Sequence, residues 1–283
     1  MCWGVYDFNH WNSFFLAGFY AIPGLVGILL GAPLIAQEIQ HGTYRLSWTQ
    51  SITRVRWLFM KLLVGGMATV AISIGIVVLG EWWVGAVRAA GSFAPENFDI
   101  FPANFDLTGI APVAYGVFAF MLGAVLGAII RRTGWAVLVG LIGFGGLRAL
   151  IRFNVRSHLA PLATGSLSGP TAPPHTWWIV QSGWVPLGRT SPSANHTWAS
   201  GTQTVIGCIE RLGTHRLANG GSVTYFGEGI YRRCAALERL HFVVQYQPSS
   251  HFWAIQAAEG GIFLGLAGVF FALTVVVVKR WRS

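Results

Sequence analysis

Five long apolar runs constrain this chain more than any other feature of its sequence. Each run is long enough to cross the hydrocarbon core of a membrane as a helix, which takes about 20 residues. Only 10% of the 283 residues are charged, whereas a soluble domain carries about 25%. We therefore predict an all-α polytopic membrane protein, and we exclude a cytosolic enzyme and a disordered chain. The predicted transmembrane helices cover residues 13–36, 62–80, 107–130, 133–153 and 260–278.

The charged residues between these runs predict an orientation. Segment 37–61 carries four basic residues and one acidic residue, and Arg131-Arg132 and the C-terminal Lys279–Arg282 cluster are also basic. Segment 81–106 carries four acidic residues and one basic residue. Because basic loops stay in the cytoplasm, we place the C-terminus in the cytoplasm and the N-terminus outside. The net charge of +9 forms no single basic stripe, so we predict no nucleic-acid partner.

The N-terminal segment suggests a further span. Residues 1–12 contain no Lys or Arg and no cleavage site of a signal peptide. A chain that begins outside without a signal is expected to follow an earlier transmembrane helix. We therefore expect six spans in the complete protein.

Three regions follow along the chain. Residues 1–153 hold the first four transmembrane helices, residues 154–259 form a large extracellular segment, and residues 260–283 hold the last helix and a basic tail. Cys208 and Cys234 both fall in the extracellular segment, an oxidising environment, so we predict a disulfide between them and leave Cys2 unpaired. Six of the eight histidines also lie in this segment, where a metal site is a minor alternative to our prediction of none.

Segment 37–62 carries the most informative motif. It reads QEIQHGTYRLSWTQSITRVRWLFMKL: an acidic residue soon after a span, then Gly-Thr, a polar turn, and basic residues leading into the next span. This pattern resembles the permeases of ABC-2 type transporters. Further matching segments, at 106–115, 123–133 and 246–263, are similar to the actinobacterial branch of that family and extend the resemblance along most of the chain.

The resemblance implies the function of a permease subunit in an ABC exporter of a bacterial plasma membrane. Loop 37–61 would form short cytoplasmic helices that dock on a separate ATPase subunit, and the chain would pair with a second permease copy. No phosphate-binding G-x-x-x-x-G-K-[ST] motif occurs, so ATP would act through the partner chain and this chain would hold no cofactor. The resemblance also implies a short re-entrant helix at 250–258. The coupling candidates are Glu38, Gly42, Thr43, Arg54, Arg56 and Lys61.

Two alternatives to this interpretation remain. Segment 37–61 is also compatible with an ordinary positive-inside loop, whose Arg54, Arg56 and Lys61 contact anionic headgroups of membrane lipids. The whole chain is also compatible with a non-transporting scaffold or sensor that presents its extracellular segment. An enzyme is disfavoured because neither H-E-x-x-H nor G-x-S-x-G occurs, and the sequence does not identify a substrate.

Two arginines fall inside the fourth run. Arg148 and Arg152 lie four residues apart, hence on one helical face near its outer end. Charges within membrane segments are costly and mark functional candidates, but long side chains also extend to the headgroups, which is the interpretation we favour. If either arginine is functional, Glu259 is its candidate partner, and the three residues are candidates for an outer gate.

Overall fold

The computed structural model describes residues 3–42, 53–89, 105–167, 177–187, 197–216, 222–224 and 228–280. These residues belong to two compact units. The first contains residues 1–94, 102–159 and 252–283, and the second contains residues 95–101 and 160–251. The second unit is thus inserted in the sequence between two helices of the first.

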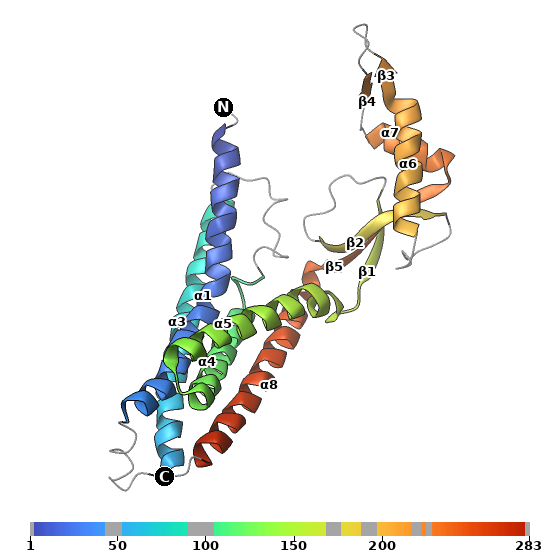
Figure 1. The fold of residues 1–283 in the computed structure, drawn as a ribbon. Helices are drawn as coiled ribbons and strands as arrows, with labels where there is room; N and C mark the ends of the chain where they lie inside the picture. Colours follow the sequence, from blue (N-terminus) through green and yellow to red (C-terminus); the bar gives the residue numbers. More distant parts are fainter. Residues whose placement is uncertain are drawn as a thin grey trace. The chain divides into compact units, whose positions relative to one another are not determined.

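In its described residues, the first unit is a bundle of five helices (Figure 1). They are α1 (Trp3–His41), α3 (Arg54–Ala89), α4 (Ala111–Ile130), α5 (Thr133–Leu150) and α8 (Phe252–Lys279). Each contains a segment long and apolar enough to cross a membrane. The predicted polytopic helical fold is therefore confirmed as a mainly α fold, with a small sheet in the second unit. Helices α1, α3 and α8 extend several residues past the apolar runs, whereas α4 begins four residues later and α5 ends three residues earlier than its run.

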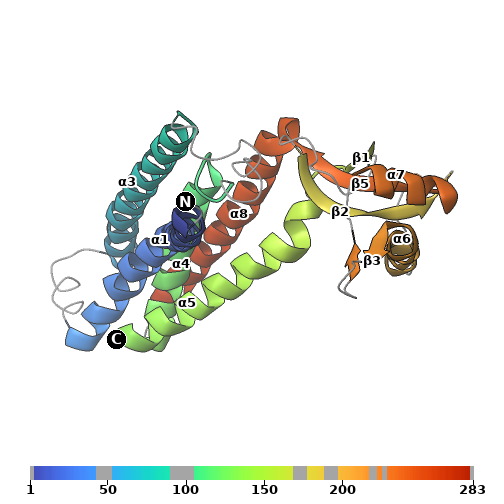
Figure 2. The same cartoon turned by 90° about the horizontal axis from the view of Figure 1, so that it is seen from above.

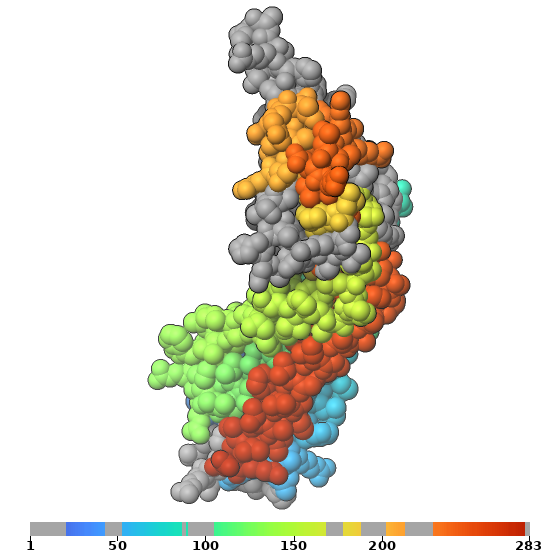
Figure 3. All heavy atoms as spheres, turned by 90° about the vertical axis from the view of Figure 1, so that its right-hand side faces the viewer, coloured from blue at the N-terminus to red at the C-terminus, as the bar shows by residue number. Residues whose placement is uncertain are grey.

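Helix α4 is the centre of this bundle. Two thirds of its span, 67%, is buried, whereas the other four spans are 22–44% buried. Viewed from above, α1, α3, α5 and α8 surround it (Figure 2). The outer helices bury only one stripe, and on the face seen in Figure 3 the residues of α8 lie exposed along its length. Exposed apolar side chains are expected where a helix faces lipid.

Glycines bring α1 and α4 into close contact. A Cβ atom at Gly31 would lie 2.2 Å from the carbonyl oxygen of Phe120, and one at Gly127 would lie 2.5 Å from that of Ala32. Both GxxxG pairs, Gly27/Gly31 and Gly123/Gly127, therefore lie in the contact between α1 and α4, where Gly31 approaches Gly123 and Gly27 approaches Gly116.

The helices alternate in direction, so their ends form two sets (Figure 1). The ends at His41, Arg54, Ile130, Thr133 and Lys279 lie together, and we call this the basic end of the bundle. Buried side chains of four helices pack there, including Ile35, Trp57, Ala128 and Val278. The opposite end carries the starts of α4 and α8 and the end of α5.

Two helix ends differ from the sequence predictions. The chain after α5 continues as a π-helical turn, Ile151–Val155, and a 3₁₀ turn, Arg156–His158. The re-entrant helix expected at 250–258 is not formed: a 3₁₀ turn at Ser249–His251 leads directly into α8, which is continuous from Phe252. The expectation was wrong because nothing between Phe252 and Gly261 interrupts helical hydrogen bonding; the glycines there lower helix propensity without breaking the helix.

The second unit is a small mixed α/β fold. Strand β5 (Leu240–Pro248) lies between β1 (Ala163–Leu167) and β2 (Trp177–Pro186) in an antiparallel sheet. A second pair, β3 (Thr214–Arg216) and β4 (Ser222–Thr224), is also antiparallel. Helices α6 (Thr197–Gly213) and α7 (Glu228–Leu237) complete the unit. Its core packs Trp184 and Phe242 of the sheet against Val205 and Ile209 of α6.

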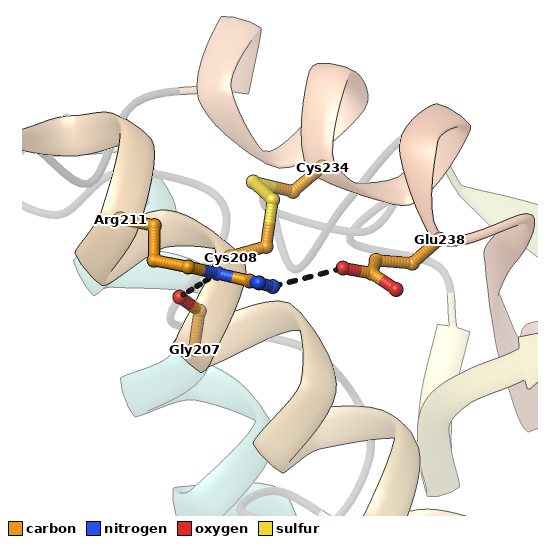
Figure 4. Close-up of a disulfide and its surroundings, with 5 residues drawn as sticks. All are labelled: Gly207, Cys208, Arg211, Cys234 and Glu238. Carbon is orange, nitrogen blue, oxygen red and sulfur yellow. Dashed lines mark hydrogen bonds and ion pairs between the residues drawn. A yellow bond between two sulfur atoms is a disulfide. The ribbon is translucent and has the colours of Figure 1, made fainter.

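A disulfide joins the two helices of this unit. Cys208 of α6 and Cys234 of α7 are bonded, with their Cα atoms 5.7 Å apart (Figure 4). Beside it, the Arg211 guanidinium donates to the carbonyl of Gly207 and to the carboxylate of Glu238. The disulfide thus holds α6 and α7 together covalently, and an ion pair joins α6 to Glu238, the residue that follows α7. Cys2 lies outside the described residues.

Candidate functional site

A buried group of charged side chains lies at the end of the bundle opposite the basic end. We call it the arginine–carboxylate cluster. Its carboxylates come from the turn before α4 and from α8, and its guanidinium groups come from α5 and the turns that follow it. Its members are Asp106, Tyr115, Arg148, Arg152, Arg156 and Glu259.

Arg156 is the central member of the cluster. Its Nε donates to Glu259 Oε2 at 2.8 Å, and its Nη2 lies 2.9 Å from Glu259 Oε1 and 2.6 Å from Asp106 Oδ1. The Phe105 ring lies against the guanidinium, 4.3 Å away. Only 2% of the Arg156 side chain is exposed. Such two-pronged contacts are among the strongest hydrogen bonds in proteins.

Tyr115 of α4 connects the two carboxylates. Its hydroxyl donates to Glu259 Oε1 at 2.7 Å and lies 3.4 Å from Asp106 Oδ1. Its ring packs edge-on against Phe263, and the Cζ atom of Arg148 lies 4.7 Å from the centre of the Tyr115 ring. The central helix therefore contacts both acidic groups.

Asp106 forms ion pairs with all three arginines of the cluster. Arg148 Nη2 and Arg152 Nη1 lie 3.4 Å and 3.1 Å from its Oδ2, and Arg156 contacts its other oxygen. Burial alone would raise the pKa of Asp106, but the charges of Arg156, Arg148 and Arg152 outweigh burial and hold that pKa below its ordinary value. Asp106 is therefore ionised at neutral pH. Its contribution to stability is present above its ordinary pKa and is lost only as the pH falls through the lowered one.

The backbone spacing explains why three arginines reach one carboxylate. On an α-helix, each step of four residues rotates the side-chain direction by about 40° beyond one full turn. The wider π-helical turn at Ile151–Val155 offsets this drift for the last step. Arg148, Arg152 and Arg156 consequently face the same side.

Gln256 holds the turn that carries Asp106. Its Oε1 accepts from the backbone N–H of Ala111 at 2.7 Å, and its Nε2 donates to the carbonyls of Phe105 and Thr108. The turn contains Gly109 at φ +76°, where a Cβ would lie 3.0 Å from Gln256 Cδ. The position of Asp106 is thus fixed by α8 through the turn that precedes α4.

The pairing expected from the sequence is corrected here. Arg148 and Arg152 meet Asp106, whereas Glu259 is bound by Arg156. Arg148 also points inward, with 11% of its side chain exposed, instead of extending to the headgroups. Sequence reasoning missed Asp106, Tyr115 and Arg156 as site residues. Arg156 continues the four-residue spacing of Arg148 and Arg152, and this spacing was a sequence signal that could have identified Arg156.

A second polar contact lies at the basic end. The Lys61 ammonium of α3 forms an ion pair with Glu38 of α1 and lies 5.3 Å from the centre of the Trp57 ring. Gln40 and Thr133 are hydrogen-bonded through their side chains, which joins α1 to the start of α5. The ion pair thus connects the two helices on either side of residues 43–52, α1 and α3.

The remaining coupling candidates are distributed around this ion pair. Arg54 begins α3 and Arg56 is exposed in its first turn, while Gly42 follows the last residue of α1 with φ +69°. Residues 37–41 and 54–61 belong to the long helices α1 and α3, so the expected separate short helices do not form there. Thr43 lies outside the described residues.

These features define a multi-pass α-helical membrane protein with a buried ion-pair cluster at one end of its bundle. A model of the family described as ABC-2 membrane transporter related matches residues 5–156, which is more than half of the chain. The chain belongs to this family. Membership indicates an ABC permease, the membrane subunit of a transporter, which is not itself the ATPase. No curated protein and no solved structure is significantly similar to the chain.

Proposed function

We propose that this chain is the permease subunit of an ABC exporter and is driven by a separate cytosolic ATPase. The basic end of the bundle would face the cytoplasm, and segment 37–61 would receive the movement of the ATPase. A second permease copy, identical or homologous, would complete the transporter. The family match spans all of this segment and four of the five helices.

The observation that carries the coupling proposal is the ion pair between Glu38 and Lys61. It ties α1 to α3 directly beside the segment that would contact the ATPase. A push on residues 43–52 would therefore move both helices together instead of bending the loop. Arg54 and Arg56, at the start of α3, offer positive charge to acidic residues of the partner.

The arginine–carboxylate cluster supports the second half of the proposal, an outer gate. It joins α4, α5 and α8 at the end opposite the proposed ATPase contact. Buried ion pairs have a well-defined geometry and break as a unit, so they suit a helix arrangement with two discrete states. The second unit would lie on the oxidising side of the membrane, where its disulfide between Cys208 and Cys234 would be stable.

Co-purification tests the coupling proposal. The tagged chain is extracted in detergent together with the ABC ATPase encoded nearest to it, as the natural chain and as the variant Arg54→Glu/Arg56→Glu. The matched control is Lys279→Glu/Arg280→Glu, which makes the same charge change at the end of α8, outside segment 37–61.

We expect the ATPase to co-purify with the natural chain and with the control, and to be lost from the first variant. Equal loss from both variants would contradict a specific docking site, because it would indicate general attraction to a basic surface. Absence of the ATPase from every sample would contradict the permease proposal and favour a non-transporting scaffold.

A further inference from the structure

The two sides of the arginine–carboxylate cluster are attached to the bundle in different ways. Its carboxylates lie on the turn before α4 and on α8, and its three arginines lie within residues 148–158, which we call the arginine segment. An outer gate opens only if these two sides separate. The contacts of each side indicate which of them moves.

Aromatic packing joins α4 to α8 on the carboxylate side. The Phe263 ring of α8 packs edge-on against Tyr115 and Phe118 of α4, with ring centres 4.8 Å and 5.2 Å apart. Phe270, two turns further along α8, also packs against Phe118. Close packing of this kind holds membrane helices together through many short contacts that water does not replace. Helices α4 and α8 therefore form one body.

Gln256 attaches the turn that carries Asp106 to the same body. The first turn of an α-helix leaves backbone N–H groups without partners, and Ile110, the N-cap of α4, makes no side-chain bond to them. The fully buried Gln256 of α8 accepts from the N–H of Ala111 and donates to two carbonyls of the turn. It thus caps α4 from another helix, and it positions Asp106 through contacts that do not involve the arginines.

The arginine segment buries few apolar side chains. Among its residues, all of which the structure describes, Arg148, Ile151 and Arg156 are buried, whereas Phe153 is 77% exposed. The segment also departs from α-helical geometry in its π-helical and 3₁₀ turns. Its buried contacts are therefore mainly charged, and the cost of desolvating a buried ion pair offsets much of its attraction. Exchanging these contacts for water consequently costs less than separating α4 from α8.

We propose that the arginine segment is the moving part of the outer gate, and that Gln256 is the positioning residue that keeps the carboxylate side fixed. Opening exchanges the ion pairs of Asp106 and Glu259 for water and leaves the aromatic contacts between α4 and α8 intact. The inference deepens the outer gate proposed above and rests on it. Its test uses the purified chain without an ATPase, so a failure of ATPase coupling does not affect the result.

The reactivity of single thiols measures which side moves. In a Cys2→Ser background, Ile151→Cys reports on the arginine segment and Ala114→Cys reports on the contact between α4 and α8. Both positions are buried, and a Cβ at Gly260 of α8 would lie 3.8 Å from that of Ala114. The rate of modification by a charged, water-soluble thiosulfonate is measured in neutral detergent.

Two variants with matched changes test the role of the carboxylates. Asp106→Asn/Glu259→Gln removes both negative charges of the cluster, and the control Glu38→Gln/Glu238→Gln makes the same kind of change at the basic end and in the second unit. We expect the first variant to raise the rate at Ile151→Cys by about tenfold or more, because a reagent reaches a buried thiol only in the opened state. The rate at Ala114→Cys should change by less than about twofold, and the control should change neither rate, because α4 and α8 stay packed in both variants.

A third variant tests the positioning role of Gln256. Gln256→Met removes its hydrogen bonds and keeps an unbranched side chain of similar length. We expect it to raise the rate at Ile151→Cys by about threefold, and to add nothing further in the Asp106→Asn/Glu259→Gln background, since residues that act through one another are not additive. A merely structural role would multiply the two effects, and that result would overturn the positioning role.

Two further results would overturn the proposal. An equal rise at Ile151→Cys and Ala114→Cys, both in the carboxylate variant and in Gln256→Met, would show that α4 and α8 separate together with the arginine segment. The outer gate would survive that result. No rise at either position would show that the cluster does not hold the segment, and the outer gate would fail as well.

Discussion

Arg156 has the largest of the fully buried side chains in the described part of the chain. Removing a guanidinium and two carboxylates from water costs several kcal/mol per ion, and hydrogen bonds of good geometry offset this cost only in part. The cluster therefore adds little net stability compared with an apolar core. Its consequence is geometric, because Arg156 satisfies Glu259 and Asp106 only while α5 and α8 keep one relative position.

Removing one member of the cluster should be costly. We expect Arg156→Met to lower the free energy of unfolding in detergent by about 3–5 kcal/mol, because the buried Glu259 would lose the arginine that forms its ion pair. The control Lys61→Met also breaks an ion pair of the same bundle, but one that is about a quarter exposed, and should cost about 0–1 kcal/mol. Denaturant titration followed by circular dichroism measures both. Similar losses would show that burial does not distinguish the two pairs.

The sequence revealed this cluster only in part. Arg148 and Arg152 stood out because charges are rare inside apolar runs, and Glu259 because it begins the last run. Asp106 did not, since an acidic residue just before a span is ordinary in a loop outside the membrane. Which carboxylate meets which arginine depends on the packing of α4 against α5 and α8, and on the π-helical turn at Ile151–Val155. Neither the helix packing nor the π-helical turn can be predicted from the residue spacing in a single sequence.

At the scale of elements, the contact between α1 and α4 shows why a glycine pattern is informative only with its partner. Glycine pairs at four-residue spacing let two helix backbones approach closely, and the structure places two such pairs, Gly27/Gly31 and Gly123/Gly127, in the contact between α1 and α4. The pair Gly261 and Gly265 on α8 meets no atom within 4 Å of a Cβ. Identical spacing therefore has different consequences, and only the fold distinguishes them.

An added methyl group tests the contact between α1 and α4. We expect Gly31→Ala to lower the free energy of unfolding by about 1–3 kcal/mol, because its Cβ would overlap the backbone carbonyl of Phe120 and force the helices apart. The matched control Gly75→Ala meets open space and should be neutral or stabilise α3 by up to about 1 kcal/mol. Thermal unfolding in detergent measures both. A neutral Gly31→Ala would contradict the close approach.

The disulfide allows a prediction for the inserted unit. Cys208 and Cys234 are 26 residues apart, and closing a loop of that length stabilises a fold by about 3–4 kcal/mol in the chain-entropy model. We expect Cys208→Ser/Cys234→Ser to make α6 and α7 sensitive to limited proteolysis while the helical bundle stays resistant. Proteolysis of the bundle at the same rate would contradict separate units.

At the scale of the whole molecule, length and hydropathy predicted the five-helix architecture because a membrane leaves the backbone few alternatives to helices. The inserted unit was not predictable in the same way. Its strands are short, and β5 pairs with β1 and β2 from far earlier in the sequence. Such pairing is decided by tertiary packing, since β-propensity depends strongly on context. The basic residues, by contrast, were enough to predict which helix ends lie together.

The same residues predict which end faces the cytoplasm. In a Cys2→Ser background, one cysteine is placed at Leu187, which is 65% exposed in unit two, and another at the exposed Arg132 of the basic end. Because basic ends stay inside, we expect a membrane-impermeant maleimide to label Leu187→Cys on intact cells and Arg132→Cys only after permeabilisation. The native disulfide does not react, so each variant offers a single thiol. The reverse pattern would place the basic end outside, where no cytosolic ATPase could reach segment 37–61, and would exclude the proposed coupling.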